Sequence, residues 1–128
     1  MDVNRREPPR EFRVGDGQTV LRHSADVELD PDEQVTFVTP SGTELDLVRK
    51  AWGYYATPSM NGRLQSHGLR AALVLGKGGK LYLHLVESGQ EDEFESYLRD
   101  EGMRVVSWLD SDEAVSDAVR RLDDGDTG

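Results

Sequence analysis

The sequence predicts an α+β fold with a mostly antiparallel sheet and two to three helices. Two apolar runs, residues 69–75 and 81–87, flank a glycine-rich turn, which is typical of a β hairpin. Both faces of this hairpin are apolar, so we expect it to be covered on both sides or to lie centrally in a sheet. Residues 90–101 carry apolar side chains at helical spacing, and Gly102 follows as the expected helix end.

The first fifty residues predict small β hairpins. Residues 1–11 are charged and contain two consecutive prolines, so we expect a flexible arm there. Residues 19–21 and 27–29 favour two short strands that are separated by polar residues. Residues 34–50 contain a β-branched run, a proline–serine–glycine turn and an alternating run, which together predict a hairpin.

The second half predicts alternating strands and helices. Residues 52–57 are aromatic and extended, and residues 60–67 predict a short helix that Ser59 caps. After the hairpin and the helix described above, residues 103–109 predict another strand, and a last helix is expected to begin after Ser111. The order of elements in this half is therefore β-α-β-β-α-β, which matches the ferredoxin-like arrangement.

The length of 128 residues predicts one folded domain with loose ends. We expect this α+β domain to span residues 12–122. Its β-rich half would be residues 12–50, and the βαββαβ-like half with the final helix would be residues 51–122. Residues 123–128 are acidic and rich in glycine, which predicts a disordered tail.

The composition excludes several classes of protein. Cysteine is absent, which excludes disulfides, thiolate nucleophiles and cysteine-ligated metals. No apolar run approaches the roughly 20 residues of a membrane span, and the first residues lack the apolar stretch of a signal peptide. We therefore expect a cytoplasmic protein that does not contact a membrane.

The charge distribution points to a basic middle in an acidic chain. The net charge of −10 argues against binding to nucleic acid or to an anionic membrane. Residues 41–80, however, contain six basic and two acidic side chains. This segment predicts a surface that faces an anion, although an ordinary solvated exterior is the alternative.

A candidate ligand site follows from the ferredoxin-like arrangement. A right-handed crossover would bring the loop after residues 52–57 and the loop after residues 69–75 to one edge of the sheet. The first loop would supply hydroxyls and the N–H groups of a helix start, and the second would supply lysines. The candidate ligand-binding residues are Thr57, Ser59, Asn61, Arg63, Lys77, Tyr54 and Tyr55. Ordinary turn chemistry is the alternative for the loops, and packing is the alternative for the tyrosines.

No motif for catalysis, a metal or a cofactor is present in the sequence. The three histidines are far apart, and the glycine-rich turn does not match a nucleotide-binding loop. We therefore expect a non-enzymatic module that binds either a protein partner or an anionic small molecule carrying phosphate or carboxylate. One alternative is an enzyme for a phosphorylated or carboxylated metabolite, with His67 or His84 as general base. The other is a structural or regulatory subunit that pairs through a sheet edge, and the oligomeric state is left open.

Overall fold

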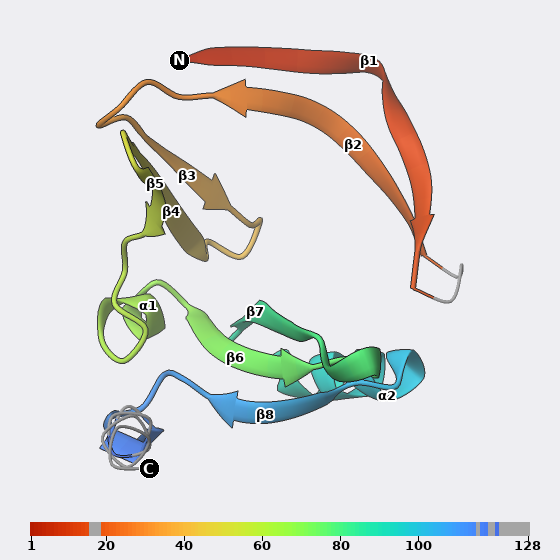
Figure 1. Cartoon of the computed structure of the whole chain (residues 1–128), viewed down its shortest axis with the longest axis vertical. Coiled ribbons are helices and arrows are strands. Elements are labelled where there is room, and N and C mark those ends of the chain that lie inside the picture. Colours follow the sequence, from red (N-terminus) through yellow and green to blue (C-terminus); the bar gives the residue numbers. More distant parts are fainter. Residues whose placement is uncertain (16–18, 115, 118–119, 121–128) are drawn as a thin grey trace. The chain divides into compact units, whose positions relative to one another are not determined.

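The computed structural model describes residues 1–15, 19–114, 116–117 and 120, and it shows an α+β fold of antiparallel strands with short helices (Figure 1). The hydrogen-bonded sheets have the strand orders β1-β2, β3-β4-β5 and β7-β6-β8. The predicted fold class is confirmed at this level. In chain order the elements are β1 (Asp2–Val14), β2 (Thr19–Glu28), β3 (Gln34–Val38), β4 (Glu44–Lys50), β5 (Gly53–Ala56), α1 (Arg63–Ser66), β6 (Leu69–Leu75), the 3₁₀ turn η1 (Lys77–Gly79), β7 (Leu81–Glu87), α2 (Glu91–Glu101) and β8 (Arg104–Trp108).

The chain divides into two compact units. The first consists of Met1–Val35 and Leu47–Tyr55, and the second consists of Thr36–Asp46 and Ala56–Gly128. The first unit contains β1 and β2, and the second contains α1, α2 and the sheet of β7, β6 and β8. The single domain expected over residues 12–122 stays a prediction.

β6 forms the centre of the second unit. It lies between β7 and β8 and is antiparallel to both. Leu69 and Ala71 pack in one hydrophobic cluster, with Leu64 of α1, whereas Ala72 and Val74 pack in another, which includes α2. Because alternate residues of a strand point to opposite faces, β6 is buried on both sides. The hairpin predicted at residues 69–75 and 81–87 and the central place of its first strand are confirmed.

α2 confirms the helix predicted at residues 90–101. Three acidic side chains occupy its first turn, where the partial positive charge of the helix end favours them, and Leu98 is its buried residue. Gly102 ends the helix with a φ of 68°, in the left-handed region. The side chain of Lys77 lies close to Gly102, with its Cε 2.8 Å from where a Cβ atom would be, so a larger residue here would displace this flexible side chain.

The ferredoxin-like arrangement is not confirmed. β5 is hydrogen-bonded to β4 in the sheet β3-β4-β5, whereas β6, β7 and β8 form their own sheet. Only two residues, Ala51 and Trp52, separate β4 from β5. So short a connection favours a hairpin, because it brings consecutive strands together at little cost in loop entropy. The local pairing of β5 with β4 therefore replaces the predicted pairing with later strands.

The helix predicted at residues 60–67 is much shorter than expected. α1 covers four residues, because Asn61 and Gly62 are poor helix formers and Gly62 has non-helical backbone angles. Gly68 follows α1 with a φ of 85°, as expected for a helix end. A Cβ atom at Gly68 would lie 2.7 Å from Cγ2 of Thr43, so only glycine fits against this buried side chain.

The largest difference from expectation lies in the first 28 residues. The segment expected to be a flexible arm lies mostly within β1, and the two short strands expected near residues 19–29 are one continuous strand, β2. β1 and β2 pair as an antiparallel ribbon, with Val3 opposite Val27 and Phe12 opposite Leu21. The polar residues in the middle of β2 hide the usual alternation, because both faces of the ribbon are largely exposed.

The last predicted helix is only partly described. The hydroxyl of Ser111 accepts a hydrogen bond from the N–H of Ala114 at 3.0 Å, as a helix cap does. Residues 112–114, 116–117 and 120 are helical. The tail expected at residues 123–128 lies outside the described residues. Within the described part of the chain, none of the helices has the length and apolar character needed to cross a membrane.

Candidate functional site

The loop before α1 uses its polar groups to hold the chain itself. The hydroxyl of Ser59 accepts a hydrogen bond from the N–H of Arg63 at 3.1 Å. The side-chain amide of Asn61 donates to a carboxylate oxygen of Asp112 at 3.0 Å, and the N–H of Thr57 donates to the carbonyl of Asp46 at 3.1 Å. The contact of Ser59 is local chemistry at a helix start, which was the alternative to an anion site, whereas those of Asn61 and Thr57 join the loop to distant segments of the chain.

The structure does not bring Lys77 to Ser59. Ser59 and α1 precede the first residue of β6, whereas Lys77 follows its last residue and lies beside Gly102 (Figure 1). Seven extended residues separate these two ends by about 20 Å. The predicted convergence of the two loops is not observed, because it required β5 to lie in the sheet of β6, whereas β5 is hydrogen-bonded to β4. Anion binding by either loop alone stays a prediction.

The two tyrosines of the predicted site belong to the first unit. The guanidinium of Arg49 lies 5.5 Å from the ring centre of Tyr54, within cation–π range. The ring of Tyr55 stacks on Trp52 with centres 6.3 Å apart and planes inclined by 20°. Each tyrosine thus has a contact within its own unit, but both rings stay exposed, so neither the ligand-binding prediction nor the packing alternative is decided.

The three histidines have separate surroundings. In the first unit, Nε2 of His23 lies 2.9 Å from a carboxylate oxygen of Asp26. In the second unit, Nδ1 of His67 lies 3.8 Å from a carboxylate oxygen of Glu44. His84 packs among aromatic rings, and burial lowers its pKa. Among the described residues, no group of three or more histidine, aspartate or glutamate side chains is arranged to hold a metal ion.

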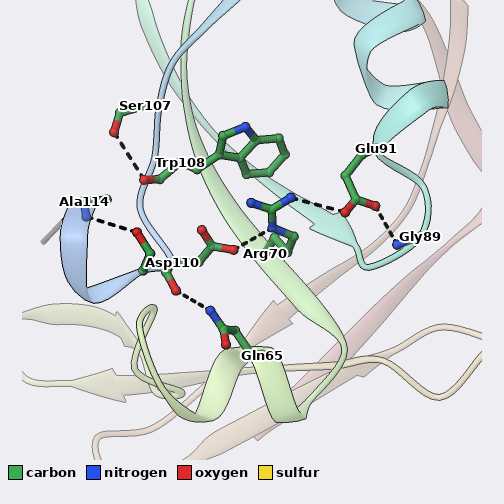
Figure 2. A network of polar contacts seen from close by, with 9 residues as sticks. Gln65, Arg70, Gly89, Glu91, Ser107, Trp108, Asp110 and Ala114 are labelled. Atoms are coloured by element: carbon green, nitrogen blue, oxygen red, sulfur yellow. Dashed lines mark hydrogen bonds and ion pairs between the residues drawn. The ribbon is translucent and has the colours of Figure 1, made fainter.

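A network of charged and polar groups in the second unit is centred on Arg70 in β6 (Figure 2). Its Nε donates to Asp110 at 2.6 Å, and its NH1 donates to Glu91 at 3.2 Å. The guanidinium also lies 3.9 Å from the ring centre of Trp108. Asp110 is only 4% exposed, and its backbone carbonyl accepts a hydrogen bond from Gln65.

This network joins α1, β6, the first residue of α2 and the segment after β8. Hydrogen bonding to Asp110 raises the pKa of Arg70, and the backbone N–H groups of Glu91 and Gly89 lower the pKa of Glu91, so the charged forms are favoured. A buried carboxylate is tolerated because it is paired and hydrogen-bonded. The signal for the network was an arginine inside an otherwise apolar strand, which needs an acidic partner once the strand is covered.

A second polar cluster holds the turn between β3 and β4 against the end of β7. The hydroxyls of Thr39, Ser41 and Thr43 lie 2.5, 2.6 and 3.0 Å from one carboxylate oxygen of Glu87. These hydrogen bonds lower the pKa of Glu87, and the one from Ser41 has the largest effect. Every one of these hydroxyls is engaged with the carboxylate, so the cluster acts as a brace for the turn.

The ribbon of β1 and β2 carries several exposed apolar side chains, as do β3 and β7. Phe12 is 38% exposed and its partner Leu21 is 44% exposed, and Val3 and Val27 are similarly open. β1 is hydrogen-bonded only to β2 in the described sheets, so each strand has one unpaired edge. Sequence reasoning missed this surface because it predicted a flexible arm here.

The two faces of the ribbon differ in charge. Residues directly opposite each other in an antiparallel ladder share a face, as do alternate residues of one strand. One face, called the cationic face below, contains no carboxylate among its paired residues, whereas the other contains four. The cationic face consists of Val3, Arg5, Arg10, Phe12, Val14, Thr19, Leu21, His23, Ala25 and Val27, and the opposite face of Asp2, Asn4, Glu11, Arg13, Val20, Arg22, Asp26 and Glu28.

A scan against protein-family models, a search of curated proteins and a search of solved structures each found no match. The function is therefore argued from the chain's own residues. Of the surfaces described above, the ribbon combines exposed apolar side chains, segregated charge and unpaired strand edges.

Proposed function

We propose that this chain is a non-enzymatic protein-interaction module and that the ribbon of β1 and β2 is its contact arm. The observation that carries the proposal is the pairing of a thirteen-residue strand with a ten-residue strand, with no third strand beside either in the described sheets. A two-stranded ribbon is only marginally stable in water. A partner that adds a strand or covers the apolar side chains would stabilise it.

Strand edges are a known means of recognising proteins. An unpaired edge offers a row of N–H and C=O groups to an incoming extended segment, and the side chains on each face provide selectivity. The exposed side chains of Phe12 and Leu21 lie directly opposite each other on the cationic face. These features support a protein ligand that contributes both backbone hydrogen bonds and apolar contact.

The charge of the chain supports a protein partner over a polyanion. The cationic face carries Arg5 and Arg10 without a paired carboxylate, which favours a partner that is apolar and moderately acidic. The whole chain has a net charge of −10, which would repel nucleic acid and anionic membranes over distances of a Debye length, about 8 Å at physiological salt. The proposal places the module in the cytoplasm, in keeping with its lack of cysteine.

Site-specific photo-cross-linking in the native host cells tests the proposal. A photoreactive phenylalanine analogue replaces Phe12 on the cationic face in one version of the chain and Glu11 on the opposite face in the control. We expect a discrete polypeptide adduct from position 12 and at most a weak one from position 11. The adduct at position 12 should be lost with Leu21→Ser and retained with Asn4→Ser, because Leu21 lies opposite Phe12, whereas Asn4 lies on the opposite face and on β1, away from the free edge of β2.

Two results would overturn the proposal. The absence of any polypeptide adduct from position 12 would show that the cationic face meets no protein. Equal adducts from positions 11 and 12, insensitive to Leu21→Ser, would show only random collisions. In both cases circular dichroism of the purified variants verifies that the chain is folded.

Anion binding by the loop before α1 needs an experiment of its own, because the proposed contact arm does not depend on it. Ser59 and Asn61 are engaged with the chain's own groups, so they offer little support for a phosphate or carboxylate ligand. Calorimetric titration with inorganic phosphate measures this directly. Heat that is lost in Arg63→Gln would support the anion-binding alternative, and the absence of heat would count against it.

A further inference from the structure

We infer that the partner of the ribbon is a second copy of this chain, which pairs with the first through the free edge of β2, antiparallel, with Ser24 at the two-fold axis. This inference rests on the proposed function, because it names the partner of the same contact arm. The result would be a four-stranded antiparallel sheet in the order β1-β2-β2-β1, with the cationic faces of both copies on one side.

The two edges of the ribbon are not equivalent. β1 is interrupted between Arg5 and Arg10, where its register with β2 shifts, and this interval contains Pro8 and Pro9. Prolines lack the N–H group, and both prolines and bulges are devices that prevent pairing at a sheet edge. β2 contains ten residues without a proline or a lysine. Its edge is therefore the one suited to receive another strand.

The sequence of β2 is complementary to itself in one register. When two copies of β2 pair antiparallel, the numbers of opposite residues always add to the same total. For the cationic faces of both copies to lie on the same side of the sheet, that total must be even, because alternate residues of a strand point to opposite faces. With Ser24 opposite its own copy, Arg22 lies opposite Asp26, and Leu21 lies opposite Val27. Each of these favourable pairs occurs twice because of the two-fold symmetry. Sliding β2 by one face-preserving step in one direction would place His23 opposite His23 and would remove both favourable pairs. Sliding it in the other direction would keep one ion pair, with Arg22 opposite Glu28, but would place Leu21 beyond the end of the second copy's β2.

The register within each ribbon extends these pairs into rows across four strands. Phe12 lies opposite Leu21, and Val3 lies opposite Val27. The proposed dimer therefore aligns Phe12, Leu21, Val27 and Val3 in one apolar row, which occurs twice. Three or more strands with an apolar face are what an independently stable sheet needs, so pairing supplies what the isolated ribbon lacks.

On the opposite face, the same register continues the alternation of charge. Glu11 lies opposite Arg22, and Asn4 lies opposite Asp26, within each copy. Asp26 already accepts Arg6 at 2.8 Å on one carboxylate oxygen and His23 at 2.9 Å on the other. A carboxylate has about four lone-pair sites, so Asp26 can also accept Arg22 of a second copy.

Disulfide trapping tests the register directly, because the natural chain has no cysteine. Ser24→Cys is exposed, and its own copy would lie directly opposite, at a distance a disulfide can bridge. Under mild oxidation we expect Ser24→Cys to form covalent dimers at least about tenfold faster than Val20→Cys, because pairing raises the local thiol concentration only at the axis. A one-to-one mixture of Val20→Cys and Glu28→Cys should cross-link faster than either variant alone, because these positions lie opposite each other in the proposed register.

The outcomes separate this inference from the proposed function. Light scattering of the natural chain should show a dimer that dissociates on dilution. The dimer of the Arg22→Glu variant should dissociate at a higher protein concentration than that of the natural chain, because the new carboxylate would face Asp26 of the second copy. Equal rates for Ser24→Cys and Val20→Cys, or a chain that stays monomeric at all concentrations, would overturn the inference. If the photo-adduct at position 12 then contains a different protein, the contact arm stands with another partner. If position 12 gives no adduct, the proposed function falls as well.

Discussion

β6 and the ribbon of β1 and β2 are both antiparallel strand pairings, but they are stabilised in different ways. β6 has a neighbour on each edge and a hydrophobic cluster on each face. β1 and β2 each have one hydrogen-bonded neighbour in the described sheets, and apolar side chains such as Phe12 and Leu21 stay exposed. The second unit thus contains its own core, whereas we propose that a partner covers the edge and the apolar side chains of the ribbon.

The ion pairs of the two regions also differ in how far they are buried. Arg70 pairs with Asp110, whose side chain is 5% exposed, whereas Arg6 pairs with Asp26, whose side chain is 52% exposed. A charge buried without its partner is strongly destabilising, but an exposed pair contributes little. Equal substitutions in the two regions should therefore have very unequal effects on the free energy of unfolding.

The largest effect is expected from Arg70→Met. This change leaves the buried Asp110 without its cation and should lower the free energy of unfolding by about 3–5 kcal/mol. Urea unfolding followed by circular dichroism measures it, with Arg104→Met on the exposed side of β8 as the control. A loss no larger than that of the control would show that the network of Figure 2 does not support the second unit.

A pair of leucine truncations gives the next largest difference. Leu98 of α2 is 2% exposed, and Leu98→Ala should cost about 3 kcal/mol because it opens a cavity. Leu21 of the ribbon is 44% exposed, and Leu21→Ala should cost less than about 1 kcal/mol in dilute protein. The same urea titration measures both, at a concentration low enough to keep the chain monomeric. Equal costs would contradict the distinction between a complete core and an incomplete ribbon.

The contrast between the two regions also explains what could be predicted from the sequence. β6, β7 and α2 were predictable because a strand or helix that is buried carries an uninterrupted apolar run or a regular apolar spacing. β1 was not, because an exposed two-stranded ribbon has no buried face to impose such a pattern. Charged residues and Pro8–Pro9, which suggested an arm, are here part of an interrupted edge strand.

The candidate site depended on long-range topology, which local patterns do not determine. Capping by Ser59 was predictable from the residues around it, and its hydrogen bond to the N–H of Arg63 agrees. The proximity of Ser59 to Lys77 required β5 to join the sheet of β6, and the two-residue connection to β4 prevented this. The cationic face could not be seen in the sequence because it depends on the register between β1 and β2.

A smaller, pH-dependent effect is expected at His84. Burial among the rings of Phe94 and Tyr97 lowers its pKa below the ordinary value of about 6.5. Below that value the unfolded chain takes up a proton more readily than the folded chain, so stability should fall as the pH drops from 7.5 to 5.5. Unfolding titrations at several pH values measure the slope.

The variant His84→Phe keeps an aromatic ring at this position and should remove that part of the slope. His67→Gln, which leaves His84 intact, is the matched control and should keep it. The pKa of Glu87 is also lowered, and its contribution to the free energy of unfolding is lost only below the ordinary glutamate pKa of about 4.3. Glu87 therefore does not affect the slope between pH 7.5 and 5.5. An unchanged slope in His84→Phe would show that another group causes the pH dependence.

The smallest effect is expected from Arg6→Met. It removes the exposed ion pair with Asp26 and should change the free energy of unfolding by less than about 1 kcal/mol. The comparison with Arg70→Met isolates burial, since the two substitutions are chemically identical. A loss from Arg6→Met as large as that from Arg70→Met would mean that the ribbon is held together by its own charges and needs no partner.

Hydrogen exchange of backbone amides at two protein concentrations tests the central claim most directly. Amides of β6 should be protected equally in dilute and concentrated protein, because both edges of that strand are already paired. Amides of β2 should exchange rapidly in dilute protein and become protected as the concentration rises. Protection of β2 that is strong and independent of concentration would contradict the account, because the ribbon would then be complete by itself.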